Sequence, residues 1–279
     1  MKRLGLILIA AYLTIVLGYA LFQRNLIFHP TALDGTTPKD YSLSYEDVYF
    51  ASPDGVTLNG WWIRHPQADP RRPVLLYCHG NAANLSHLAE VSRIFYDFGF
   101  DAFLFDYRGY GASGKAPSGL SETALDADAL SAYRWLQSKG FKENRVLIWG
   151  HSLGSSVAAQ LASQTHPAGL ILEGAFPSIY AVSREKYPWL LFPPFLIRDK
   201  FCTENYVARR TCPLLEIHAE RDSIIPLFLG RKVFGKAAEP KEWMTIEGIN
   251  HNDFPSVARK YKNQICNFAK KCLRESIKP

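Results

Sequence analysis

The stretch Gly150-His151-Ser152-Leu153-Gly154 follows directly on the apolar run Val146-Leu147-Ile148-Trp149. A short apolar run of this kind is typical of a buried strand, and good helix formers follow the stretch without a breaker until Pro167. The sequence therefore predicts a strand, a sharp turn at Ser152 and a helix. Glycine on both sides of the turn fits this prediction, because a Cβ there would clash with closely approaching backbone. Such a turn pushes a serine hydroxyl out over the edge of a sheet.

Strands alternate with helices along most of the chain after a polar, proline-rich segment at residues 66–73. The expected strands are Val74–Cys78, Ala102–Asp106, Val146–Trp149, Gly169–Leu172, Leu214–His218 and Trp243–Ile246. The expected helices are about Ser86–Phe98, Ser121–Lys139, Ser152–Gln164, Leu227–Ala237 and Pro255–Arg274. Upstream, Glu46–Phe50 and Thr57–Ile63 flank the turn signal Pro53-Asp54-Gly55 and predict an antiparallel hairpin. The pattern predicts an α/β fold with a mostly parallel sheet between two layers of helices.

The N-terminal segment is apolar enough to enter a membrane. Residues 4–22 carry no charge and lie between Lys2-Arg3 and Arg24. As a helix this run would be ~28 Å long, close to the hydrocarbon thickness of a bilayer. A cleaved signal peptide is the alternative, since Gly18-Tyr19-Ala20 offers small residues at a suitable spacing, but the run exceeds the usual signal core. We expect residues 1–24 to be an uncleaved single-pass anchor with a cytoplasmic N-terminus, which would place the folded domain on the extracytoplasmic side.

Composition bounds the rest of the chain. The 279 residues are 47% hydrophobic and 21% charged, which predicts one folded domain over residues 25–279. Half of the net charge of +6 comes from basic residues that flank the N-terminal apolar run, and with no nucleic-acid-binding motif we expect no nucleic-acid partner. The five cysteines do not form a disulfide framework or a metal-ligand pattern, although Cys202 and Cys212 can pair if the domain is extracytoplasmic. Composition leaves the oligomeric state open.

The connection between Glu173 and Leu214 is too long for a plain crossover. It carries the aromatic and proline-rich segment Tyr187–Phe195. We expect a short cap at about residues 176–210. Two interpretations stay open: the cap either shapes an apolar acyl pocket or leans toward the membrane, or it packs on the sheet edge with no role in the site.

A serine hydroxyl needs a base to take its proton and a third group to orient that base. His251 follows the last predicted strand and Asp222 follows the strand before it. Because the carboxyl ends of parallel strands meet at one edge of a sheet, we expect both side chains near Ser152. Glu173, which also ends a strand, is the alternative acid, whereas Asp253 is expected to begin or cap the last helix.

Acyl transfer also needs donors that face the developing oxyanion. The amide of Leu153, directly after the serine, is the first candidate. The second is expected from the loop at residues 79–84, where we favour the amide of Asn81 with that of Ala82 as the alternative. Asp106, at the end of the next strand, is expected to bond loop amides near the site.

Four motifs occur in order: Cys78–Asn84, Asp106–Gly111, Gly150–Gly154 and Gly248–Asp253. Together they resemble those of the α/β-hydrolase superfamily, and most closely its membrane-anchored, short-cap branch of Bem-type or α/β-hydrolase-domain serine hydrolases. The resemblance implies an eight-stranded sheet, a triad of Ser152, Asp222 and His251, and hydrolysis of ester, thioester or amide bonds without a cofactor. One position departs from the pattern, because Ala219 stands where relatives have glycine. If that position needs a positive φ, Asp222 would be displaced.

These observations together predict a membrane-anchored serine hydrolase. We expect a small-molecule or lipid acyl substrate, because the anchor holds the site near the bilayer and the cap is rich in aromatic residues. A peptidase or an acyltransferase of the same fold is the alternative. A non-catalytic binding or scaffold protein is a further alternative, but such proteins have usually lost a triad residue and none is missing here.

Overall fold

Eight short strands form one sheet in the computed structural model, which describes residues 2–67, 69, 72–115, 119–189 and 192–275. The strands are β1 (Glu46–Ala51), β2 (Thr57–Ile63), β3 (Val74–Cys78), β4 (Asp101–Phe105), β5 (Val146–His151), β6 (Gly169–Glu173), β7 (Leu214–Ala219) and β8 (Lys241–Ile246). Their order in the sheet is β1-β2-β4-β3-β5-β6-β7-β8. Strands β3 to β8 run parallel, while β2 pairs antiparallel with both β1 and β4. The predicted fold class is confirmed.

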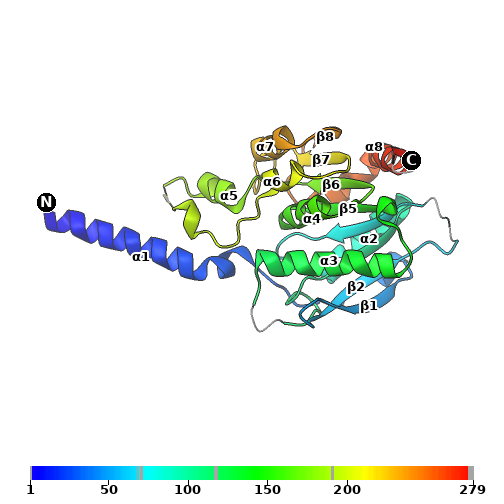
Figure 1. The fold of residues 1–279 in the computed structure, drawn as a ribbon, viewed down its shortest axis with the longest axis horizontal. Helices are drawn as coiled ribbons and strands as arrows, with labels where there is room; N and C mark the ends of the chain where they lie inside the picture. Colours follow the sequence, from blue (N-terminus) through cyan, green and yellow to red (C-terminus); the bar gives the residue numbers. More distant parts are fainter. Residues whose placement is uncertain (1, 68, 70–71, 116–118, 190–191, 276–279) are drawn as a thin grey trace.

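Helices cover both faces of the sheet (Figure 1). They are α2 (Ala89–Asp97), α3 (Glu122–Ser138), α4 (Leu153–Gln164), α5 (Ile179–Lys186), α6 (Thr203–Val207), α7 (Leu227–Lys236) and α8 (Phe254–Glu275). Side chains of one strand alternate between the layers: Leu76 and Cys78 of β3 pack with α3 and α4, whereas Leu75 and Tyr77 pack with α2 and α8. Both faces of the central strands are therefore buried, which is why they read as continuous apolar runs.

Boundaries differ from the prediction where polar residues belong to an element. β8 begins at Lys241 rather than Trp243, because its pairing with β7 continues to the polar end of the strand. The helix predicted from Ser86 is replaced by a 3₁₀ turn at Leu85–Leu88 and then α2. Asn84 begins that turn, since its Oδ1 accepts a hydrogen bond of 2.9 Å from the amide of Ser86.

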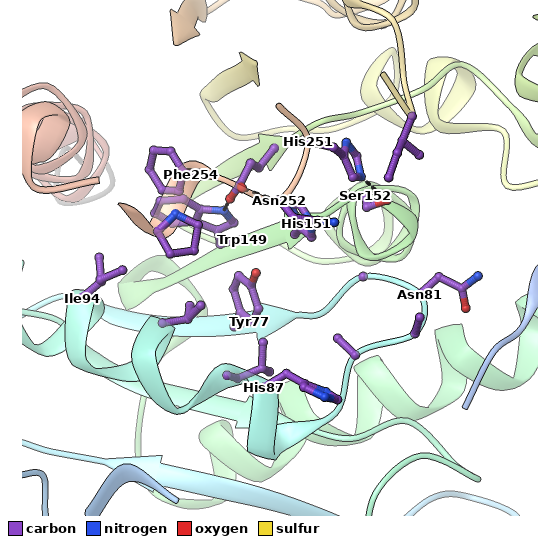
Figure 2. Close-up of a pocket in the computed structure, with 18 of the residues that line it drawn as sticks. Tyr77, Asn81, His87, Ile94, Trp149, His151, Ser152, His251, Asn252 and Phe254 are labelled. Atoms are coloured by element: carbon purple, nitrogen blue, oxygen red, sulfur yellow. Dashed lines mark hydrogen bonds and ion pairs between the residues drawn. The ribbon is translucent and has the colours of Figure 1, made fainter. Parts of the chain in front are cut away.

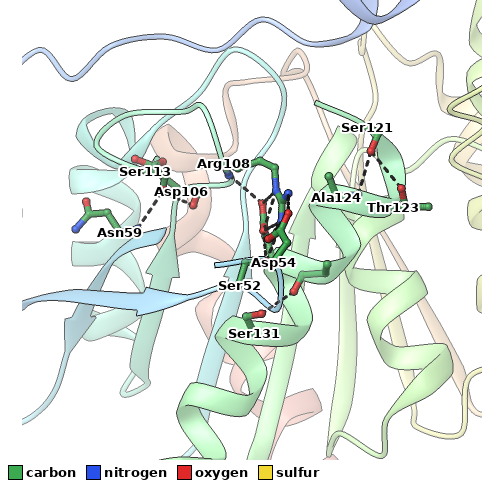
Figure 3. A network of polar contacts seen from close by, with 12 residues as sticks. Ser52, Asp54, Asn59, Asp106, Arg108, Ser113, Ser121, Thr123, Ala124 and Ser131 are labelled. Atoms are coloured by element: carbon green, nitrogen blue, oxygen red, sulfur yellow. Dashed lines mark hydrogen bonds and ion pairs between the residues drawn. The ribbon is translucent and has the colours of Figure 1, made fainter. Parts of the chain in front are cut away.

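A buried charge network fastens the N-terminal hairpin to the core (Figure 3). The guanidinium of Arg108, which follows β4, donates to Asp128 of α3 at 2.7–3.1 Å and to Asp54 of the hairpin turn at 2.6–3.1 Å. Ser52 completes the network by donating to Asp128 at 2.9 Å. Asp128 is fully buried, so the planar fork of Arg108 compensates a charge that has no access to water.

The N-terminal helix α1 (Lys2–Ile27) extends away from the sheet at one end of the molecule, beside the segment that contains α5 (Figure 1). Among the described residues it is the one helix long and apolar enough to cross a bilayer. Its N-terminal half exposes large apolar side chains, such as Leu6 and Ile7. This length and apolar character are consistent with a single-pass membrane protein.

The predicted cap contains α5, a 3₁₀ turn at Pro194–Leu196 and α6. Its residues 190 and 191 lie outside the described part of the chain. The cap borders two different surroundings, because α5 and the 3₁₀ turn face α1 while α6 packs against α4 of the core. The sequence leaves open whether Cys202 and Cys212 form a disulfide. In the structure both are free thiols.

Candidate active site

Ser152 occupies a strained turn between β5 and α4, with φ 52° and ψ −120°. Glycine is required on both sides of it. A Cβ at Gly150 would lie 2.6 Å from the Cβ of Ala158, and a Cβ at Gly154 would lie 2.6 Å from the carbonyl carbon of Cys78. The helix can approach the sheet this closely only without those side chains, so the local sequence dictates the position of the serine.

Three side chains that are far apart in the sequence meet at this turn. The Oγ of Ser152 lies 2.8 Å from Nε2 of His251, and Nδ1 of His251 lies 2.6 Å from Oδ2 of Asp222 (Figure 2 shows the serine and the histidine). Both His251 and Asp222 are buried. Burial alone would raise the pKa of Asp222, but the hydrogen bond and charge of His251 hold that pKa below its usual value. The arrangement can therefore draw a proton from the serine onto an oriented imidazole.

The loop that carries the acid is held by its own amides. Oδ1 of Asp222 accepts hydrogen bonds from the amides of Ile224 at 2.9 Å and Ile225 at 2.6 Å. Ala219, at the end of β7, does not adopt a positive φ. The loop thus has no need for glycine at this position, and Asp222 is not displaced from His251.

Two further titratable side chains, Glu216 and His218, are buried on β7, the strand that precedes Asp222. The sequence analysis did not single them out. Nε2 of the buried His218 lies 2.8 Å from the carbonyl oxygen of Ile225 and 3.6 Å from Oδ2 of Asp222. Burial raises the pKa of Glu216, two residues earlier on the same face of β7, well above its usual value. The available signal was the presence of two polar residues at alternate positions of a buried strand.

The structure places the alternative acids elsewhere. The carboxylate of Glu173 lies 3.1 Å from Nδ1 of His151 and accepts a hydrogen bond of 3.0 Å from the indole of Trp149. Burial alone would lower the pKa of His151, but the charge of Glu173 raises it. Asp253 precedes α8 and accepts a hydrogen bond of 3.0 Å from the amide of Asn250. Neither carboxylate takes the position beside His251.

Candidate oxyanion donors lie around the serine. Leu153 is the first residue of α4, so its N–H is not used by the hydrogen bonds of that helix. The loop after β3 passes close to the serine, because a Cβ at Gly80 would lie 3.3 Å from the Cβ of Ser152. In the described structure the amides of Asn81 and Ala82 donate to no other residue. Both remain candidates for the second donor.

Buried polar groups support the loop after β3. Oδ1 of Asp106 accepts a hydrogen bond of 2.9 Å from the amide of Leu85, which is the loop contact expected from the sequence. Burial raises the pKa of Asp106 to about 8 and lowers that of the neighbouring His79 to about 4. Tyr107 donates to the carbonyl oxygen of His79 at 3.3 Å. The loop therefore rests on groups that are largely uncharged near neutral pH.

Two cavities meet at Ser152, where both are also bordered by Asn81 and Ile224. The inner cavity of about 560 Å³ lies over the sheet edge (Figure 2) and has the apolar lining residues Tyr77, Leu88, Val91, Ile94, Phe95 and Phe254. The outer cavity of about 490 Å³ lies between α1 and the cap and has the apolar lining residues Tyr19, Leu26, Phe176, Ile179, Val182 and Phe192. Among the described residues no cluster of three or more histidine, cysteine or acidic side chains could hold a metal ion.

Comparison with known proteins agrees with this geometry. Residues 69–198 match the family described as serine aminopeptidase, S33. An uncharacterized protein of Mycobacterium tuberculosis is 36% identical over 83% of this chain and 81% of its own. The chain is an α/β-hydrolase. Lysophosphatidylserine lipase ABHD12 of Rattus norvegicus is similar to this α/β-hydrolase, with 31% identity over 78% of this chain and 63% of the lipase.

Solved structures support the fold of the hydrolase. Esterase Pf2001 of Pyrococcus furiosus superimposes with a TM-score of 0.71 over 88% of this chain and 100% of its own, at 20% identity. The α/β-hydrolase GrgF from a Penicillium species gives a TM-score of 0.65 over 83% of this chain and 100% of its own, also at 20% identity. These structures confirm the architecture of the sheet, and the family match and the lipase relative confirm the expected superfamily and its hydrolytic class.

Proposed function

We propose that this α/β-hydrolase cleaves acyl esters of lipid-like substrates through a covalent acyl-enzyme on Ser152. The observation that carries the proposal is the chain of two short contacts from Ser152 through His251 to Asp222, placed where two apolar cavities meet. His251 is the general base and Asp222 orients it. The amides of Leu153 and Asn81 hold the oxyanion.

The reaction runs in two halves. Ser152 attacks the acyl carbon as its proton moves to Nε2 of His251, and the same nitrogen then gives that proton to the leaving alcohol. Water enters, loses a proton to His251 and attacks the acyl carbon, so that the free acid leaves and Ser152 is restored. Asp222 keeps its charge throughout and stabilises the imidazolium, in keeping with its lowered pKa.

Three observations support a lipid-like substrate. The lining of both cavities is mainly apolar, the outer cavity borders the apolar helix α1, and the rat relative is a lysophosphatidylserine lipase. We further propose that α1 is an uncleaved anchor with a cytoplasmic N-terminus. The buried side chain of Val16 and the ring contact of 5.3 Å between Tyr19 and Phe192 support an uncleaved α1, because cleavage after Ala20 would remove Val16 and Tyr19 from the fold.

A peptidase is the second candidate, because the matching family is described as serine aminopeptidase. An aminopeptidase needs a carboxylate to bind the free amine of its substrate. Among the described residues that line the two cavities the one carboxylate is Glu173, and it already contacts His151 and Trp149. Because Glu173 is already engaged by His151 and Trp149, it is not available to bind a substrate amine, and ester cleavage is favoured over aminopeptidase activity. An acyltransferase would use the same residues and would be recognised by transfer of the acyl group to an added alcohol.

Labelling with a fluorophosphonate tests the proposal on the full chain in detergent. We expect labelling and hydrolysis of an activated ester in the wild type, and loss of both in Ser152→Ala. Ser156→Ala is the matched control, because the hydroxyl of Ser156 is buried on α4, the helix that follows Ser152, and has no hydrogen-bond partner among the described residues. Retention of ester hydrolysis by Ser152→Ala would refute the proposal, and cleavage of aminoacyl amides in preference to esters would favour the peptidase.

A further inference from the structure

We propose that the C-terminal half of α1 is a wall of the acyl-binding site, so that the acyl chain of a membrane-resident ester lies in the outer cavity along this helix while the leaving alcohol occupies the inner cavity. This inference rests on the proposed function and assigns a different part of the substrate to each cavity. It makes the N-terminal helix a determinant of acyl-chain specificity as well as an anchor.

The direction of proton transfer assigns the leaving group to the inner cavity. His251 must give its proton to the alcohol oxygen, so the alcohol has to leave on the side of the site that His251 borders. His251 lines the inner cavity, together with the polar side chains of His87 and Asn252, and is not among the lining residues of the outer one. The acyl portion is then left with the outer cavity, which borders Ser152 and Leu153.

The outer cavity has the walls that an alkyl chain requires. Tyr19 and Leu26 of α1 form one side, and Ile179 and Val182 of α5 form the other. The N-terminal half of α1 extends away from the sheet (Figure 1), and its large apolar side chains are exposed. A chain in this cavity therefore lies beside the same helix that enters the bilayer, and it can leave the lipid without crossing water.

Specific contacts hold α1 in this place. Oε1 of Gln23 accepts a hydrogen bond of 2.7 Å from the amide of Arg198 in the cap, and Gln23 is only 4% exposed. Arg24 donates to the buried carboxylate of Asp199 at 2.8 Å. An anchor that merely tethered the domain would need no buried amide contact with the cap.

The end of α1 is also joined to the candidate oxyanion loop. The side chain of Asn81 donates to the carbonyl oxygen of Ile27, and its Oδ1 accepts hydrogen bonds of 3.0 Å from the amide of His29 and the hydroxyl of Tyr110. The loop that faces the reacting carbonyl and the wall of the outer cavity are thus parts of one hydrogen-bonded unit.

Filling the outer cavity from α1 tests the inference. The full chain in detergent is assayed with p-nitrophenyl esters of acyl chains from butanoate to hexadecanoate. In Leu26→Trp we expect kcat/KM for hexadecanoate to fall on the order of tenfold for every two methylenes displaced, while butanoate changes little. Leu21→Trp is the matched control, because Leu21 is an exposed leucine of the same helix outside either cavity lining. In Val91→Trp, which fills the inner cavity, the chain-length preference should stay as in the wild type.

Two outcomes would overturn the inference: an unchanged chain-length profile in Leu26→Trp, or a shift toward shorter chains in Val91→Trp. A short-chain fluorophosphonate that labels all three variants shows that each is folded with a reactive serine. Failure of the wild type to hydrolyse any of these esters would instead refute the proposed function on which the inference rests. A shortened preference in Leu26→Trp alone supports it.

Discussion

Replacement of Asp106 by asparagine should change how the stability of the fold depends on pH. Asp106 is fully buried. Its Oδ1 accepts a hydrogen bond from the amide of Leu85, while its Oδ2 has no hydrogen-bond partner in the described structure. Burial raises its pKa from 3.8 to about 8. Asp106→Asn keeps the oxygen that accepts from Leu85 and removes the titration.

The magnitude follows from proton linkage. Between pH 4 and 8 the unfolded chain has lost the proton of Asp106 and the folded chain keeps it, so the free energy of unfolding falls as pH rises, by about 1.4 kcal/mol per pH unit. From pH 5 to 8 the wild type should therefore lose ~4 kcal/mol relative to Asp106→Asn. Nε2 of His79 lies 3.5 Å from Oδ1 of Asp106, but burial lowers the pKa of His79 to about 4, so folded His79 stays uncharged from pH 5 to 8. If the new amide changes the free energy of unfolding by a constant amount, that amount is the same at every pH and does not alter the difference between pH 5 and pH 8.

Urea unfolding followed by tryptophan fluorescence, on the full chain in detergent at pH 5, 6, 7 and 8, measures this difference. Glu90→Gln removes one negative charge from an exposed position and controls for the change in net charge. The reasoning predicts curves of stability against pH that diverge for Asp106→Asn alone. Parallel curves for wild type and Asp106→Asn would refute it, because they would mean that Asp106 is charged in the folded protein.

Three further predictions concern the charge network, the turn at the serine and the triad. Arg108→Met should lower the free energy of unfolding by ~3–5 kcal/mol in urea denaturation, because it leaves Asp128 buried without its cation; a loss below ~1 kcal/mol would contradict this account. Gly154→Ala should abolish fluorophosphonate labelling, since its Cβ would lie 2.6 Å from the carbonyl carbon of Cys78, and normal labelling would show that the turn can move. Asp222→Asn should lower kcat for an activated ester by ~10⁴-fold, and activity near that of the wild type would remove Asp222 from the mechanism.

Much of the fold could be predicted from local patterns in the sequence. The turn at Ser152 was predictable because glycine has to flank it, and the sheet was predictable because strands buried on both faces must be continuously apolar. His251 and Asp222 could be placed near the serine because the carboxyl ends of parallel strands share one edge. The start of β8 could not be predicted, since pairing rather than hydropathy includes Lys241 in that strand.

By itself the sequence determined the elements, their order and the edge of the sheet at which the candidate site lies, because each of these depends on neighbouring residues and on simple periodicity. Only the tertiary structure decided which partner a polar side chain takes: Glu173 contacts His151 rather than His251. It also brought Gln23 of α1 to Arg198 of the cap, 175 positions away, at a place where Gln23 lines the outer cavity. Contacts between residues so far apart depend on how helices and loops pack, and packing leaves no periodic signal in either segment.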